Sequence, residues 1–323
     1  MSTTFAPDLP ASAEPLRGIL RSAPLGAAVS TAPLVTPVPI VGMSVTVPRA
    51  AAVTDLLLSP LGACVHDSAV TVIRSRLLRD FPRVAQGLRT GVELHLGSYL
   101  LRSALGRPDR CSETEFIPNP LNCRRAIGLA GLARSIKNHG LPPAAAVANL
   151  LTDTLVDVEA GGHNGSRLAW WARWYSKQEP AVRAVVQAEA TTWATEMYGT
   201  IDWSRFGRRT VVGGPDDWWR CPTARHVALQ GRAEIRTWVG GRQVQLVVSS
   251  GYPTVSWRAE LAFPALVAAL GRGIRATPAR VVGLWPDTGQ VRVLPIDLST
   301  LNDAAEGVTH AVGVIAAIRS AGR

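Results

Sequence analysis

The sequence has few of the features that mark secreted, metal-stapled or membrane-spanning proteins. Its four cysteines are scattered over 323 residues without a C-x-x-C pair, which argues against a zinc ribbon or a disulfide framework and predicts reduced, buried thiols. No uninterrupted apolar run reaches the roughly 18 residues that a membrane-spanning helix needs. The opening stretch MSTTFAPDLPASAEP has neither a basic n-region nor an apolar h-region, so no secretion signal is predicted. We therefore expect a cytoplasmic protein with no membrane partner.

Motifs for several common chemistries are also missing. The glycine-rich stretch GGHNGS (161–166) lacks the Lys-Ser/Thr pair of a P-loop and follows no predicted strand, so it does not favour phosphate binding. There is no G-x-S-x-G elbow of the kind that presents a nucleophilic serine. The histidines at 139, 163 and 226 have no Cys or Asp at metal-ligand spacing, which indicates structural or surface roles.

The charge shows a moderate excess of basic residues. The chain has 34 basic and 24 acidic residues, a formal net charge of +10, and this excess favours an anionic partner, nucleic acid first. An arginine- and alanine-rich composition is equally what a GC-rich genome produces, so the charge leaves both explanations open. There is no polybasic run of the kind that marks a localisation signal or a tail.

The chain divides into three predicted regions. Residues 1–42 are rich in Pro, Ala, Ser and Thr and are predicted to form a disordered arm. Residues 43–175 show helical periodicity, and residues 176–323 mix helices with strands. Helices are predicted over 91–105, 123–140 and 144–160, with two more between 167 and 203.

The period of the apolar residues changes from 3.6 to 2 after the segment 213–219. Two strands, 225–238 and 241–249, are predicted to form a hairpin, and residues 279–297 a second hairpin. The helix 256–273 separates the two hairpins, and a closing helix follows them. The fold class is therefore α+β, with a helical N-terminal region followed by a small mixed β-sheet flanked by helices.

The order of elements from residue 179 resembles the RecB-type branch of the PD-(D/E)XK nuclease superfamily. That family has a helix with a glutamate, then a hairpin with G-R-x-D on one strand and D-x-K on the next. A helix with Q-x-x-x-Y and a last pair of strands follow. The resemblance implies a site in which carboxylates hold Mg²⁺ and a lysine orients or deprotonates the attacking water.

The resemblance carries over residue by residue. Glu189 takes the place of the helix glutamate, and Gly231-Arg232-Ala233-Glu234 that of G-R-x-D. Ser249 stands where the central acid belongs and Gly251 where the lysine belongs. Glu260 and Pro264 replace the Gln and Tyr of the next helix. Because a neutral hydroxyl is a weak ligand for a hard cation, this pattern predicts a degenerate site.

Three functions follow from this pattern. The first is a catalytically impaired PD-(D/E)XK-like protein that binds nucleic acid or docks in a larger protein assembly, without a cofactor. The second is a Mg²⁺-dependent DNA nuclease whose metal ligands include Glu189 and Glu234, with Glu260 and Arg258 as migrated catalytic residues. Arginine is a poor proton acceptor, because its pKa exceeds about 12, but it orients phosphate well. The third is a purely structural interaction protein.

A basic helix supplies most of the predicted nucleic-acid contacts. The segment 123–140 is compatible with a helix-turn-helix element in which Gly128 and Gly131 form the turn, although an ordinary solvated basic helix has the same pattern. The predicted contact residues are Arg124, Arg125, Arg134 and Lys137, with Arg232 of the G-R-x-D-like motif.

Two tryptophan-rich segments allow a functional and a structural interpretation. In GGPDDWWRCP (213–222), Asp216 and Asp217 with the tryptophans indicate either a metal or base contact, or a turn whose tryptophans pack on the sheet. In WWARWYSK (170–177), Trp171 and Trp174 are placed either to stack on unpaired bases or to pack in a core. We favour the packing interpretation for both.

Overall fold

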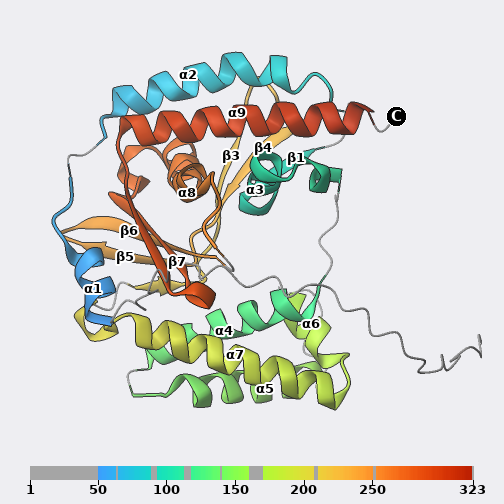
Figure 1. Ribbon diagram of the computed structural model, residues 1–323, viewed down its shortest axis with the longest axis vertical. Coiled ribbons are helices and arrows are strands. Elements are labelled where there is room, and N and C mark those ends of the chain that lie inside the picture. Colours follow the sequence, from blue (N-terminus) through green and yellow to red (C-terminus); the bar gives the residue numbers. More distant parts are fainter. Residues whose placement is uncertain are drawn as a thin grey trace, which may run out of the picture. The chain divides into compact units, whose positions relative to one another are not determined.

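The chain folds as an α+β protein, as predicted, with helices through its first half and most strands in its second (Figure 1). The computed structural model describes residues 50–62, 65–88, 93–112, 118–138, 140–159, 170–206, 210–249 and 252–321. They belong to one compact unit that extends from residue 45 to residue 323. The predicted arm at 1–42 lies outside the described residues.

The elements are as follows. The helices are α1 (Ala50–Leu58), α2 (Asp67–Val84), α3 (Ser98–Gly106), α4 (Pro120–Lys137), α5 (Pro143–Glu159), α6 (Trp170–Ser176), α7 (Pro180–Thr200), α8 (Trp257–Arg272) and α9 (Leu298–Ala321). The strands are β1 (Leu94–Gly97), β2 (Val211–Val212), β3 (Asp217–Arg220), β4 (Val227–Gly231), β5 (Ile235–Val239), β6 (Arg242–Val248), β7 (Arg280–Trp285) and β8 (Gln290–Pro295). Within the described part of the chain, no helix is both long enough and apolar enough to cross a lipid bilayer.

A five-stranded mixed sheet forms the centre of the second half, with strand order β2-β5-β6-β7-β8. β5 and β6 form the predicted antiparallel hairpin, whose two-residue turn consists of Gly240 and Gly241 at φ 54° and 78°. Glycine suits this turn because both positions need positive φ. β6 and β7 are parallel, so their connection must cross over, and α8 makes that crossover. β8 then pairs with β7 as predicted.

Helices cover both faces of this sheet. One core cluster joins Leu246 and Val282 of the sheet to Trp193 of α7, and another joins Val281 to Phe263 of α8. Because both faces are covered, all six residues of β7 are buried. The predicted helix at 256–273 is confirmed as α8 despite Pro264 within it, and it is buried continuously from Glu260 to Leu270. A helix apolar on all sides belongs in a protein interior.

A second, three-stranded sheet was not predicted. Its strand order is β1-β4-β3, with β1 parallel and β3 antiparallel to β4. The predicted helix at 91–105 was wrong in its first part, because Leu94–Gly97 forms β1 before α3 begins. The pairing partner of Leu94 is Val227, and such a distant partner leaves no local signal in the sequence.

The predicted single strand at 225–238 was also wrong, because it divides into β4 and β5. β4 joins the three-stranded sheet and β5 the five-stranded sheet, with a break between Gly231 and Ile235. At Gly231 the backbone passes close to α8, since a Cβ there would lie 3.1 Å from the Cα of Pro264. The glycine of the G-R-x-D-like motif therefore has a packing role here.

The helix predicted over 123–140 is confirmed as α4, and because Pro120–Lys137 is continuous, the helix-turn-helix alternative is wrong. A Cβ on Gly128 would lie 2.6 Å from the ring of Trp193 in α7, and a Cβ on Gly131 2.4 Å from a methyl of Val147 in α5. The two glycines thus let three helices approach closely. The aromatic helix α6 completes this bundle: Trp171 is 8% exposed and packs in the same core, which confirms the packing interpretation.

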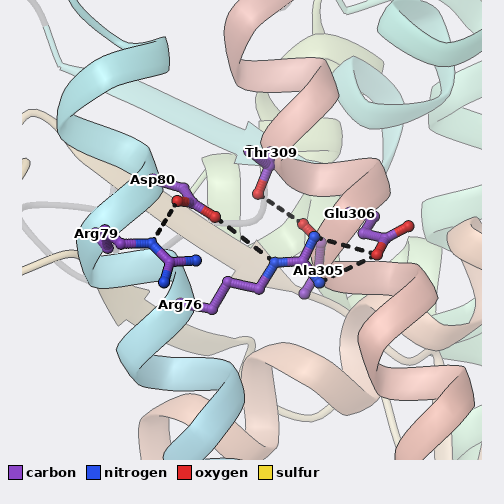
Figure 2. A network of polar contacts seen from close by, with 6 residues as sticks. All are labelled: Arg76, Arg79, Asp80, Ala305, Glu306 and Thr309. Carbon is purple, nitrogen blue, oxygen red and sulfur yellow. Dashed lines mark hydrogen bonds and ion pairs between the residues drawn. The ribbon is translucent and has the colours of Figure 1, made fainter.

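Helix α2 lies along α9 in Figure 1, and apolar contacts hold the two together. Ile73, Leu77 and Phe81, spaced four residues apart, form the buried face of α2. Figure 2 shows the polar rim of this contact, where the guanidinium of Arg76 lies 3.1 Å from the carboxylate of Glu306 and 3.6 Å from that of Asp80. Exposed ion pairs of this kind contribute about 0–1 kcal/mol each, so packing dominates. Residues before and after 176 share this core, and the division predicted there stays a prediction.

We expect Asp297→Ala to lower the free energy of unfolding by about 1 kcal/mol at neutral pH, because Asp297 caps α9. Its Oδ1 accepts a hydrogen bond of 2.8 Å from the backbone N–H of Thr300, and this bond lowers the pKa of the Asp297 carboxyl. The stabilisation is therefore complete above the ordinary pKa and is lost as the pH falls through the lowered value. Urea unfolding at several pH values measures this dependence, and Asp297→Asn, which keeps the acceptor, serves as the control.

Candidate functional site

The candidate site lies at the carboxyl end of β6, where the sequence places the degenerate D-x-K motif. Ser249 is the first residue after β6, and its backbone N–H donates to the carbonyl of Leu284 over 2.8 Å, which extends the parallel pairing with β7. Ser249 is 6% exposed, so its hydroxyl faces the interior and not solvent. Gly251, which the resemblance compares with a lysine, lies outside the described residues.

Glu234 is brought next to this strand end, as the hairpin pattern predicts. Its carboxylate accepts a hydrogen bond of 2.9 Å from the backbone N–H of Val248. Arg125, which reaches in from α4, donates to the carbonyl of Val248, and its guanidinium lies 3.9 Å from the Glu234 carboxylate. Arg125 was predicted to contact nucleic acid, whereas here it is engaged by the protein itself.

Glu260 lies on the other side of Ser249, and one arginine connects the two. The Nε of Arg102 in α3 donates to Oε2 of Glu260 over 2.8 Å, and its Nη2 donates to the hydroxyl of Ser249 over 3.0 Å. The other carboxylate oxygen of Glu260 accepts hydrogen bonds from the hydroxyls of Thr254 and Ser256. The Glu260 side chain is 6% exposed, and both of its carboxylate oxygens accept hydrogen bonds.

The charges of the site are therefore balanced by the chain's own cations. Glu234 is close to the Arg125 guanidinium and Glu260 to that of Arg102. Among the described residues, no three His, Cys, Asp or Glu side chains gather closely enough to hold a metal ion. The donor set does not fit Mg²⁺, because it combines two carboxylates already bonded to donors with a neutral hydroxyl held by a cation. We therefore derive no step through a metal.

Two of the predicted site residues lie apart from this network. Glu189 of α7 is 3.6 Å from Arg124 of α4 in a partly exposed ion pair. Arg258 is exposed and lies over the ring of Trp257, 5.8 Å from its centroid. No hydrogen bond or ion pair that we find within the described residues joins either residue to Ser249 or Glu260. The trio of Glu189, Glu234 and Glu260 stays a prediction.

The remaining basic residues predicted to contact nucleic acid are spread over the surface. Arg134 pairs with Asp153 over 2.7 Å, and Lys137 is exposed at the end of α4. Arg232 follows β4, 4.0 Å from Asp216. Their guanidinium and ammonium groups are accessible, but the residues do not form one row along α4.

The segment GGPDDWWRCP, interpreted as a turn, contains the strand β3 in its second half. β3 begins at Asp217, whose side chain is buried and contacts two arginines, Arg236 at 3.3 Å and Arg272 at 2.6 Å. Trp219 packs in the core, in agreement with the packing interpretation, whereas Trp218 is 48% exposed. Alternation along a strand explains this difference between neighbouring residues.

Sequence reasoning missed Arg102, the residue that joins Ser249 to Glu260. It lies 147 and 158 residues before these two partners, and it follows two leucines in an ordinary amphipathic helix. No local pattern marks it. The hydroxyls of Thr254 and Ser256 were also missed, although their spacing before Glu260 suits hydrogen bonds to a carboxylate in the first turn of a helix.

The sequence was compared with known proteins. No model of a protein family matches the chain, and no curated protein matches it either.

Proposed function

We propose that this chain is a catalytically impaired PD-(D/E)XK nuclease-like protein that binds nucleic acid in the cytoplasm. One observation carries the proposal: the two buried carboxylates nearest the degenerate motif are each in contact with an arginine of the chain itself. In an active site of this type, the carboxylates would face a divalent cation and an attacking water.

The topology supports the proposal. Apart from β2, β3 and β4, which lie between α7 and β5, the order α7, β5, β6, α8, β7, β8 is the order that the resemblance implies, with a helix on each face of a mixed sheet. Ser249 lies at the end of the strand that would carry the central acid. A scaffold of this kind, with guanidinium groups beside its acids, keeps the shape of such a site without its reactivity.

The charge supports binding over catalysis. A net charge of +10 attracts phosphate, and a phosphate backbone needs only accessible cations and no metal. Arg232 and Lys137 are both accessible. Such binding is expected to be tolerant of sequence and to weaken with salt.

The test is an incubation of the whole chain with linear duplex DNA and with single-stranded DNA, with and without Mg²⁺ or Mn²⁺. We expect no metal-dependent cutting and retention of DNA at low salt, which is lost as the salt concentration rises. Wild type and Glu234→Gln should not differ in DNA cutting or in DNA retention, because Glu234 has a structural role in this proposal. Gln is chosen because its amide oxygen still accepts the Val248 N–H.

Glu196→Gln is the matched control, an exposed carboxylate on α7. Metal-dependent cutting that Glu234→Gln abolishes and Glu196→Gln leaves intact would overturn the proposal and establish the nuclease. A chain that neither cuts nor retains DNA would instead be a structural interaction protein.

A further inference from the structure

The outer face of the three-stranded sheet has a composition that the proposed site does not explain. Directly paired residues lie on the same face of a sheet, and the register places His95, Ala228 and Arg220 in one row across β1, β4 and β3. The next row consists of Gly97, Gln230 and Trp218. The opposite face, with Leu96, Leu229 and Trp219, is buried against α8.

Two rings on this outer face are open to solvent. Trp218 is 48% exposed and the His95 side chain 51% exposed. Their centroids lie 5.6 Å apart with an interplanar angle of 81°, so the rings meet edge to face across the central strand β4. Gly97 contributes no side chain beside them, and a Cβ there would lie 3.8 Å from Gln230. The two rings therefore project from the sheet beside a position that has no side chain.

The carboxylate of Glu93 contacts both Arg220 and one of the two rings, His95. Glu93 accepts hydrogen bonds from the guanidinium of Arg220 and contacts the ring of His95 at 2.8 Å. These contacts, with Arg220 first, lower the pKa of Glu93 to about 2. Glu93 thus stays ionised and fixes both side chains throughout the physiological range.

Further cations lie at the edges of the face. Arg225 is exposed next to Arg220, whose Nη1 donates to the Arg225 carbonyl. Arg232 is 51% exposed at the end of β4. Arg220 lies in the row of His95, and Arg225 and Arg232 lie before and after β4, against the two carboxylates of Glu93 and Asp216. The net charge of these groups is positive, like that of the whole chain, and complements the negative charge of phosphate.

We propose that this face binds single-stranded nucleic acid, with a base stacked on Trp218 and the backbone along Arg220, Arg225 and Arg232. The inference rests on the nucleic-acid-binding part of the proposed function. Stacking requires an unpaired base, because both faces of a base in a duplex are already covered. The arginines near the rings favour a phosphate backbone as the partner, and Trp218 is the one large exposed hydrophobic residue among the residues of the two rows.

The experiment is fluorescence anisotropy of the whole chain with labelled oligo(dT) and oligo(rU), and with a hairpin duplex as competitor. We expect Trp218→Ala to weaken single-strand binding by about 5- to 150-fold, the range for loss of one stacked base. Trp218→Phe should keep most of the affinity. The dT and rU arms show which nucleic acid is preferred.

Tyr252→Ala is the matched control, since Tyr252 is 70% exposed outside this face; its affinity should equal that of wild type. Arg225→Gln is a second variant, at an exposed residue, that does not depend on the packing of Trp218. It should reduce the slope of log affinity against log salt by about 0.7, the value for one phosphate contact on a single strand.

The outcomes separate this inference from the proposed function. Wild-type binding that Trp218→Ala and Arg225→Gln leave unchanged would overturn the inference alone. Absence of single-strand binding by wild type would overturn the inference, and absence of duplex binding as well would also overturn the nucleic-acid part of the proposed function. Catalytic impairment is decided independently, by the cutting assay.

Discussion

Asp217→Ala is expected to lower the free energy of unfolding by about 3–5 kcal/mol, the usual cost of leaving a buried charge without its partner. Asp217 belongs to β3 and Arg236 to β5, and their side chains are 6% and 8% exposed. The remaining contact of Arg236 would be the carbonyl of Pro215 at 2.8 Å. The pair also joins the two sheets, so its loss should affect the whole fold. Urea unfolding followed by tryptophan fluorescence measures the change.

Asp216→Ala is the neighbouring control. The Asp216 side chain is 19% exposed, and its partners Arg232 and Gln230 lie near the surface, so we expect a loss of about 1 kcal/mol or less. The double variant Asp217→Ala with Arg236→Met should recover part of the loss, because it removes both charges. Equal losses for Asp216→Ala and Asp217→Ala would show that the buried ion pair has no special role.

Arg102→Met is expected to destabilise the protein by about 2–3 kcal/mol. It leaves the Glu260 carboxylate, which is 6% exposed, with only the hydroxyls of Thr254 and Ser256. We place the cost below that of a fully buried pair because the Arg102 side chain is 35% exposed, and solvent screens part of the interaction. Met keeps most of the side-chain volume, so the measurement reports the charge and not a cavity.

Arg107→Met is the matched control for Arg102→Met. Arg107 is exposed just after α3, and its replacement should change stability by less than about 0.5 kcal/mol. Arg102→Met with Glu260→Gln should be more stable than Arg102→Met alone, since the amide carries no charge to be buried. If Arg102→Met alone is as stable as wild type, Arg102 is not needed to neutralise Glu260. That result would weaken the proposed explanation of the impaired site.

Local periodicity explains which parts of the fold were predictable. The hairpin β5–β6 and the helix α8 were predicted because their apolar residues repeat within one element, and because glycines stand at the turn of the hairpin. The α+β class followed from the order of these elements. Amphipathic patterns need no knowledge of the rest of the chain, since an element buries its own apolar side wherever it packs.

Long-range pairing explains what was missed. Leu94–Gly97 is a strand only because Val227–Gly231 lies beside it, and the four residues LHLG have no period long enough to reveal that. The segment at 225–238 divides because α8 passes close to Gly231. The glycines of α4 were interpreted as a turn, although their role depends on Trp193 and Val147 in other helices.

By itself, the sequence determined which residues the resemblance compares with the nuclease motifs: Ser249 and Gly251 at the positions of the acid and the lysine, Glu234 at an acidic position, and Glu260 at the position of the Gln. Only the tertiary structure decided what surrounds these acids. Arg125 and Arg102 come from helices more than a hundred residues away and reach the end of β6 from two sides. The reason is physical: a buried carboxylate needs a cation or donors next to it. The fold, and not the neighbouring sequence, chooses which residues supply them.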